Sequence, residues 1–128
     1  MEYRGFKDLN VYKLAYKLAI EIFEMTKNFP KGETYALSDQ IRRLSRSVCA
    51  NLAEGYRKRK YPKHFISKML DCDGECSETL VWLDFAKDCN YITLEKYDAL
   101  TLKCKEVGAM LGAMSNHAEK FMPRENKS

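Results

Sequence analysis

The residues best suited to chemistry in this 128-residue chain are cations, and they are concentrated in one segment. Between positions 42 and 68 there are nine Lys and Arg residues against a single carboxylate, Glu54. Arginines and lysines gathered in this way attract anions, above all the phosphates of a polyanion. The alternative is a merely solvated surface, neutralised by acidic residues of a neighbouring segment. These acidic residues are Asp71, Asp73, Glu75 and Glu78.

The net charge of +4 conceals a difference between the two halves of the chain. Residues 1–70 hold 15 Lys and Arg against 7 Asp and Glu, whereas residues 71–128 hold 7 against 11. The amino-terminal half is therefore the part expected to meet a polyanion.

A helix over residues 34–58 would arrange part of this charge as a strip on its outward side. With about 100° per residue, and Val48 at the centre of the buried side, the outward side can be read from the sequence. It carries Asp39, Arg42, Arg46, Ala50, Ala53 and Arg57. Arg46 and Arg57 would lie about 16 Å apart, which suits several phosphates of a nucleic-acid backbone. An ordinary exposed face, or a close subunit contact at the two alanines, would explain the same pattern.

The strip leads into a basic corner between the second and third predicted helices. Tyr56 and Tyr61 flank four consecutive cations there, and aromatic rings beside basic side chains suit single-stranded RNA. The candidate nucleic-acid-binding residues are therefore Arg42, Arg46, Arg57, Lys58, Arg59, Lys60 and Lys63.

A second line of polar residues follows the edge of the apolar face of the same helix. It consists of Gln40, Arg43, Ser47, Asn51 and Glu54. Polar groups at such a seam need partners, because an unpaired buried group costs about 1–3 kcal/mol. We expect them to bond to a facing helix or to a neighbouring subunit.

Catalytic and metal-binding patterns are missing from the sequence. There is no P-loop, no dinucleotide fingerprint and no Ser/His/Asp set. Cys72 and Cys76 lie one helical turn apart, the spacing at which they would join His64 or His117 on a metal, but their count and spacing match no zinc pattern and favour core packing. We therefore expect no enzymatic activity, no metal or other cofactor and no small-molecule substrate.

The sequence also bears on the compartment. The five cysteines are odd in number and lie mostly among apolar residues, as reduced cysteines do. Charges occupy the amino terminus where a signal peptide would be apolar, and no apolar run is long enough to cross a membrane. These features predict a cytoplasmic protein.

Periodicity predicts four helices, over about residues 8–28, 34–58, 62–89 and 93–121. Asp8 and Thr93 are the expected N-caps of the first and last helix, and Pro62 suits a first turn. In the first helix, Tyr12, Tyr16, Ala19 and Phe23 widen the apolar stripe to one broad buried side. Short loops between long amphipathic helices favour an all-α, antiparallel up-down-up-down four-helix bundle. The chain is expected to form one domain, with a flexible tail over residues 123–128.

Several motifs accompany this pattern. The second predicted helix holds Gln40-Ile41-Arg42-Arg43, Ser47-Val48 and Asn51-Leu52-Ala53-Glu54-Gly55. Other pieces are Phe6-x-x-Leu9-x-Val11-Tyr12, Phe29-Pro30-x-x-Glu33, Gly74-x-x-x-Glu78 and Asn90-Tyr91-Ile92. In this order they resemble the bacterial four-helix-bundle proteins, also called 23S rRNA intervening-sequence proteins, over about residues 6–92.

The resemblance implies an up-down bundle that assembles as a homo-oligomer, typically a pentameric ring, with no established enzymatic activity. Members are often encoded within segments inserted into large-subunit rRNA genes. Related accessory proteins of diversity-generating retroelements present a basic surface to nucleic acid and a reverse transcriptase. This chain departs from the family at Glu75, where members commonly carry a small or hydroxyl residue after the glycine.

Together these observations predict a non-enzymatic, homo-oligomeric helical bundle that binds RNA, ribosomal or otherwise structured, through its basic surface. The alternative is a protein-interaction scaffold whose basic strip docks an acidic protein partner.

Overall fold

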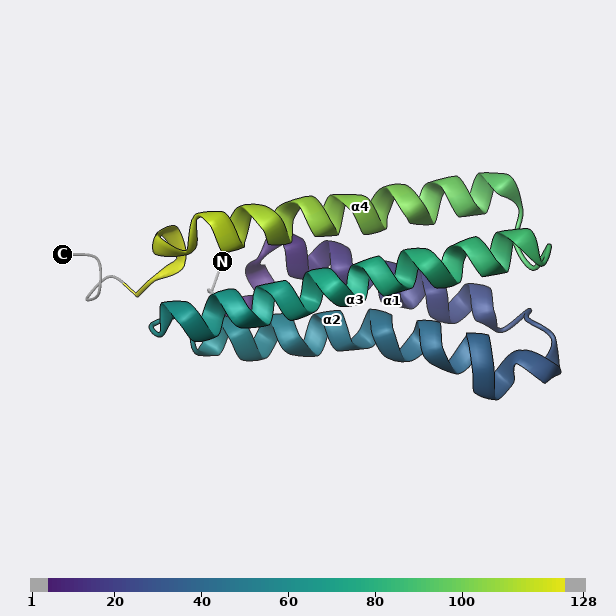
Figure 1. Ribbon diagram of the computed structural model, residues 1–128, viewed down its shortest axis with the longest axis horizontal. Coiled ribbons are helices and arrows are strands. Elements are labelled where there is room, and N and C mark those ends of the chain that lie inside the picture. The colour runs from purple at the N-terminus through teal and green to yellow at the C-terminus, as the bar shows by residue number, and fades with distance from the viewer. Residues whose placement is uncertain (1–4, 124–128) are drawn as a thin grey trace.

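The computed structural model describes residues 5–123, which fold into four long α-helices (Figure 1). The helices are α1 (Asn10–Thr26), α2 (Asp39–Arg57), α3 (Pro62–Asp88) and α4 (Leu94–Asn116). Short 3₁₀ turns occupy Gly5–Asp8, Lys31–Glu33 and Ala118–Phe121, and a π-helical turn over Thr34–Ser38 leads into α2.

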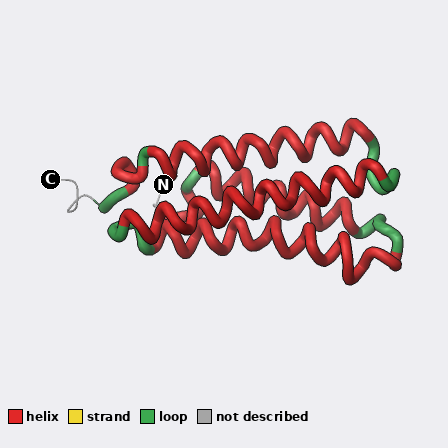
Figure 2. The backbone as a smooth tube through the Cα atoms, in the orientation of Figure 1, coloured by secondary structure: helices red, strands yellow, loops and turns green. Residues whose placement is uncertain are grey.

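The four helices run lengthwise, and their loops lie at the two ends of the molecule (Figure 2). Each helix packs against the next along the chain, and α4 closes the circle against α1. No strand occurs in the described part of the chain. The prediction of an all-α, antiparallel four-helix bundle is confirmed.

A single apolar core runs between the helices. Its largest fully buried side chains include Ile22 of α1, Ile41 and Leu52 of α2, Phe65 and Leu83 of α3, and Leu100 and Leu111 of α4. Burying a side chain of this kind contributes about 1.5–3 kcal/mol. The core thereby fixes which side of each helix faces water.

Local signals set several helix ends. The Thr93 side chain accepts a 3.1 Å hydrogen bond from the Lys96 amide, so the N-cap prediction for α4 is confirmed. Pro62 opens α3 as expected. Asn90 follows α3 with a positive φ of 63°, while the amide of Tyr91 donates back to the Ala86 carbonyl at 2.9 Å. This left-handed C-terminal cap turns the chain toward α4.

Other ends differ from the sequence prediction. Leu9, not Asp8, is the N-cap of α1, because Gly5–Asp8 forms a separate 3₁₀ turn that begins with a positive φ at Gly5. The last helix stops at Asn116, and the chain continues as the 3₁₀ turn. Of the tail predicted to be flexible, residues 124–128 lie outside the described residues.

Candidate nucleic-acid interface

The second helix has two polar flanks, and the core decides which neighbour each one meets. With Ile41, Val48 and Leu52 buried, one flank lies against α3 and the other against α1. We call the first the polar seam, formed by Ser47, Asn51, Glu54, Lys68 and Glu75. The second flank forms one wall of a groove that we call the aromatic groove. It is lined by Phe6, Tyr12, Tyr16, Ala19, Ile20 and Phe23 on one side and by Arg46, Cys49, Ala50 and Ala53 on the other.

The polar seam joins α2 to α3 through a carboxylate. Glu75 accepts a hydrogen bond from the Ser47 hydroxyl and another, of 2.9 Å, from the Asn51 side-chain amide. The Asn51 carbonyl oxygen in turn accepts from Lys68 at 3.3 Å. Glu75 thus bonds directly to two members of the predicted polar line.

Glu54 extends the seam toward the basic corner. Its carboxylate lies 3.1 Å from the Lys68 ammonium and 3.6 Å from that of Lys58. Hydrogen bonding and charge from Lys68, followed by Lys58, lower the pKa of Glu54. The other two members of the predicted line, Gln40 and Arg43, bond to each other at 2.6 Å.

A glycine allows the two helices of the seam to approach closely. A Cβ atom added to Gly55 would lie 2.7 Å from Cε of Met69 and 2.9 Å from Cβ of Lys68. Gly74 differs, since no described atom outside its own stretch of helix lies within 4 Å of its added Cβ, so packing within one copy does not explain it. The motif residues Ser47, Asn51 and Gly55 therefore build the contact between α2 and α3.

The other flank of α2 forms one wall of the aromatic groove, which has a volume of about 480 Å³. Its α2 wall consists of Arg46, Cys49, Ala50 and Ala53. The opposite wall consists of Phe6, Tyr12, Tyr16, Ala19, Ile20 and Phe23. Tyr16 is 54% exposed and Ile20 47% exposed, so the groove opens to water.

Aromatic rings line this groove in a row. The ring centroids of Phe6 and Tyr12 lie 5.1 Å apart, and those of Tyr12 and Tyr16 lie 6.1 Å apart. Burial and the neighbouring Cys49 raise the pKa of the Tyr12 hydroxyl, so that it stays neutral near pH 7. Burial likewise raises the pKa of the Cys49 thiol to about 11, which makes it a poor nucleophile.

Two predicted nucleic-acid-binding arginines lie at the Phe23 end of the groove. The guanidinium carbons of Arg42 and Arg46 lie 5.0 and 5.4 Å from the Phe23 ring centroid, within cation–π range. Arg42 is half-buried, and its Nε donates a 2.6 Å hydrogen bond to the hydroxyl of the buried Thr26. Arg46 stays exposed. The predicted strip thus borders α1, where Arg42 and Ala53 are half-buried rather than directed to water.

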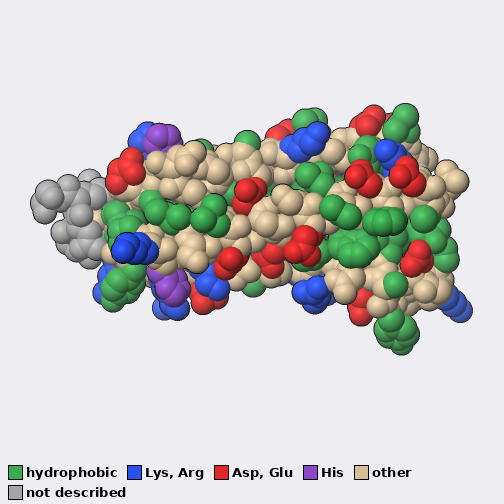
Figure 3. All heavy atoms as spheres, viewed as in Figure 1, with side chains coloured by type: hydrophobic (Ala, Val, Ile, Leu, Met, Phe, Trp, Pro, Cys, Tyr) green, Lys and Arg blue, Asp and Glu red, His purple; other side chains and the backbone are tan. Residues whose placement is uncertain are grey.

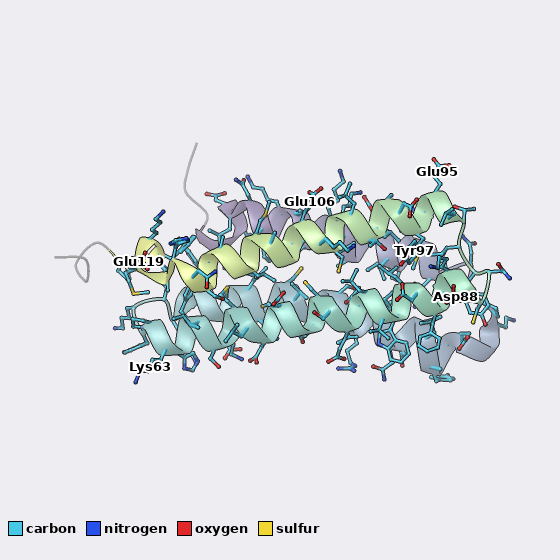
Figure 4. The ribbon with its side chains drawn as sticks, turned by 45° about the horizontal axis from the view of Figure 1, so that its top comes forward. Lys63, Asp88, Glu95, Tyr97, Glu106 and Glu119 are labelled. Atoms are coloured by element: carbon cyan, nitrogen blue, oxygen red, sulfur yellow. The ribbon has the colours of Figure 1, made fainter. Side chains whose placement is uncertain are left out.

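The remaining predicted cations lie along the end of α2 and the corner that follows. Arg57, Lys58, Lys60 and Lys63 are exposed, and Lys63 projects from the first turn of α3 (Figure 4). The half-buried Arg59 folds back, because it donates to the Tyr56 carbonyl at 3.0 Å and stacks on the Tyr56 ring. The structure therefore leaves most of the corner open to solvent.

Carboxylates neutralise little of this charge. Of the seven predicted cations, Lys58 alone lies within ion-pair distance of a carboxylate among residues 5–123. The acidic residues proposed as neutralisers form no such pair with them within that range; Glu75 is engaged in the polar seam. The face in front of the viewer in Figure 3, over α3 and α4, instead mixes acidic, basic and hydrophobic side chains.

The histidines and cysteines are not gathered into a site. Cys72 is buried and its thiol lies 3.5 Å from the Val48 carbonyl oxygen, whereas His64 and His117 are exposed. Over residues 5–123, no three His, Cys, Asp or Glu side chains are placed to share a metal ion. Within the same residues, the helices are too short or too polar to cross a membrane.

The aromatic groove is the feature that sequence reasoning missed. The periodicity of the first helix places Tyr12, Tyr16 and Phe23 on one broad buried side, but α2 covers that side only in part. A usable signal was present: small Ala50 and Ala53 face these rings and cannot fill the space beside them. The two walls belong to different helices, so their pairing needed the tertiary structure.

The fold and this interface define an antiparallel four-helix-bundle protein with a tightly joined polar seam and an open, cationic flank. The chain belongs to the 23S rRNA-intervening sequence protein family, whose model matches residues 7–113. The match includes most of α4, beyond the span of the recognisable motifs.

A solved structure supports the fold. The chain is similar to a protein of unknown function from the S23 ribosomal protein family of Bacteroides thetaiotaomicron, with a TM-score of 0.74 and 24% sequence identity. The similarity covers 83% of this chain and 95% of the other. No curated protein matches the chain with significant similarity.

Proposed function

We propose that the protein is a non-enzymatic, homo-oligomeric helical bundle that binds RNA, ribosomal or otherwise structured, through the flank of α2 beside α1 and the corner after it. The observation that carries the proposal is the open cationic surface of Arg46, Arg57, Lys60 and Lys63, with no carboxylate of residues 5–123 paired to it. Unpaired surface cations of this kind neutralise phosphates and release their counterions.

The proposal also draws on the spacing along α2. Arg46 and Arg57 are eleven residues apart on one continuous helix, or about 16 Å at 1.5 Å per residue. A backbone with several phosphates can span that distance. Self-association, proposed from the family resemblance, would repeat the modest surface of each subunit, so that weak contacts gain by avidity.

RNA binding is tested by fluorescence anisotropy with a structured RNA at low and moderate salt. We expect binding that weakens steeply with salt, and a salt slope that falls by about 1 for each phosphate contact removed. The test variant is Arg46→Gln with Arg57→Gln. Its matched control is Lys96→Gln with Lys105→Gln, which removes two exposed charges from α4. Absence of binding at low salt, or equal losses in both variants, would contradict the proposal.

A second candidate function is a scaffold that docks an acidic protein partner. The same exposed cations, Arg46, Arg57, Lys60 and Lys63, would pair with its carboxylates, and the exposed apolar side chains Val81, Phe85 and Leu94 on α3 and α4 are typical of protein contacts. A pull-down with and without nuclease separates the candidates, since RNA binding predicts recovery that nuclease abolishes. Light scattering gives the oligomeric mass, for which the proposal expects more than one copy.

A further inference from the structure

We propose that the aromatic groove between α1 and α2 takes unpaired bases of single-stranded RNA, so that the protein prefers unpaired segments to duplex. This inference rests on the proposed RNA-binding function, and it names the substrate class that the flank beside α1 selects.

The groove presents ring surface to solvent. Tyr12 and Tyr16 follow each other at one helical turn on α1, with their ring centroids 6.1 Å apart, and Tyr16 is 54% exposed. Burial raises the pKa of the Tyr12 hydroxyl, so this ring carries no charge that would repel a phosphate. Every base has a π-face, and stacking on an aromatic side chain is the usual way in which proteins hold unpaired bases.

Small residues make room for such bases. Ala50 and Ala53 of α2 face the tyrosines across the groove and leave a space of about 480 Å³. Volumes between about 300 and 1,000 Å³ are typical of pockets that bind small organic ligands. A bulky residue at either alanine would close the groove against α1.

Cations lie at both ends of the α2 wall and beside the tyrosines on α1. Arg46 lies at one end of the row of small residues on α2, and Arg57 lies one turn beyond Ala53 at the other end. On α1, exposed Lys13 and Lys17 directly follow the two tyrosines. None of the residues that line the groove in the described chain is acidic. This complementarity favours a phosphate-linked ligand over an apolar helix.

A duplex cannot use this arrangement. The faces of paired bases are stacked on one another, and the deep groove of A-form RNA keeps side chains from reaching them. Loops, bulges and ends expose the bases instead. Cations at the edge of the groove bind the phosphates of both duplex and single-stranded RNA, whereas the aromatic rings strengthen the binding of unpaired bases alone.

The experiment compares a short oligouridine with a duplex formed by that oligouridine and oligoadenosine, using anisotropy at low salt with the full chain. The test variant Tyr16→Leu keeps apolar bulk at an exposed position but removes the ring. Tyr16→Phe keeps the ring, and Tyr35→Leu is the matched control, since Tyr35 is 90% exposed and lies outside the groove. We expect Tyr16→Leu to weaken oligouridine binding at least about 5-fold and to leave duplex binding unchanged. Tyr16→Phe and Tyr35→Leu should bind as the parent protein does.

Three results overturn the inference. One is equal binding of both RNAs by Tyr16→Leu and the parent protein, and another is a loss that is the same for strand and duplex. The third is a lower oligomeric mass of Tyr16→Leu in light scattering, which would assign the groove to a second copy of the chain. If the parent protein binds neither RNA, the proposed function fails as well. If it binds both and Tyr16→Leu changes nothing, only the groove assignment fails.

Discussion

The two flanks of α2 carry polar and charged residues at similar density, but the flanks hold these residues differently. On the seam beside α3, Glu75 and Glu54 bond to Ser47, Asn51, Lys68 and Lys58. On the flank beside α1, arginines lie against an aromatic ring, and the small residues between them leave an open groove.

This difference indicates that the seam stabilises the fold, whereas the flank beside α1 is available to bind a ligand. Groups that already have partners inside the bundle gain little from an external ligand, because their partners would have to be replaced. Arg46 lies over the Phe23 ring, stays exposed to water and has no carboxylate of residues 5–123 to give up. Of the motif residues in α2, Ser47, Asn51 and Glu54 belong to the seam and Ile41, Val48 and Leu52 to the core, so much of the motif is engaged in folding and not in ligand contact.

The largest expected loss of stability comes from placing a side chain at Gly55, where α2 and α3 approach each other closely in the seam. Gly55→Val would place its side chain against Met69 and Lys68, where even a Cβ lies within 2.7–2.9 Å of described atoms. Overpacking of this kind costs about 1–3 kcal/mol, and the β-branched side chain favours the upper part of that range. Chemical denaturation measures the loss.

Its control is Gly74→Ala, at a helical glycine whose added Cβ meets no described atom within 4 Å. The helix then gains about 1 kcal/mol from the better helix former. Similar unfolding free energies for the two variants would show that the seam is not tightly packed.

A smaller loss is expected from Asn51→Ala. This change removes the amide that bonds to Glu75 at 2.9 Å and to Lys68 at 3.3 Å, and it leaves both charged groups with fewer partners. We expect a loss of about 1–2 kcal/mol in the free energy of unfolding. RNA affinity of the folded variant should not change, because the seam is occupied internally. A drop in affinity equal to that of Arg46→Gln with Arg57→Gln would remove the distinction between the flanks.

The smallest expected effect is on the stability of the protein at acid pH. Lys68, and then Lys58, lower the pKa of Glu54 in the folded protein below the ordinary value of 4.5. The contribution of Glu54 to stability is therefore present above pH 4.5 and is lost as the pH falls through the lower, folded pKa. Glu54→Gln should make unfolding less dependent on pH in that acid range. Urea denaturation at several pH values checks it, and an unchanged slope would show that the pair contributes nothing.

Much of the fold was predictable because its signals are local. Helical periodicity, Thr93 and Pro62 place elements and ends without knowledge of the neighbours. The first N-cap was misplaced for an equally local reason, since Gly5 adopts a positive φ and forms a separate turn before α1. The polar line on α2 was also predictable. Its partner was not, because the spacing of Ser47 and Asn51 does not indicate that Glu75 of another helix lies opposite them.

The sequence by itself determined the helical class and the concentration of cations in one half of the chain, since composition and periodicity act through short-range backbone and burial preferences; the order of its motifs pointed to the family. Only the tertiary structure decided that Arg46 shares a surface with Tyr12 and Tyr16, and that Glu75 serves the seam and not the cations. Those pairings depend on the orientation of each helix about its own axis, and that orientation is set by the packing of the whole bundle.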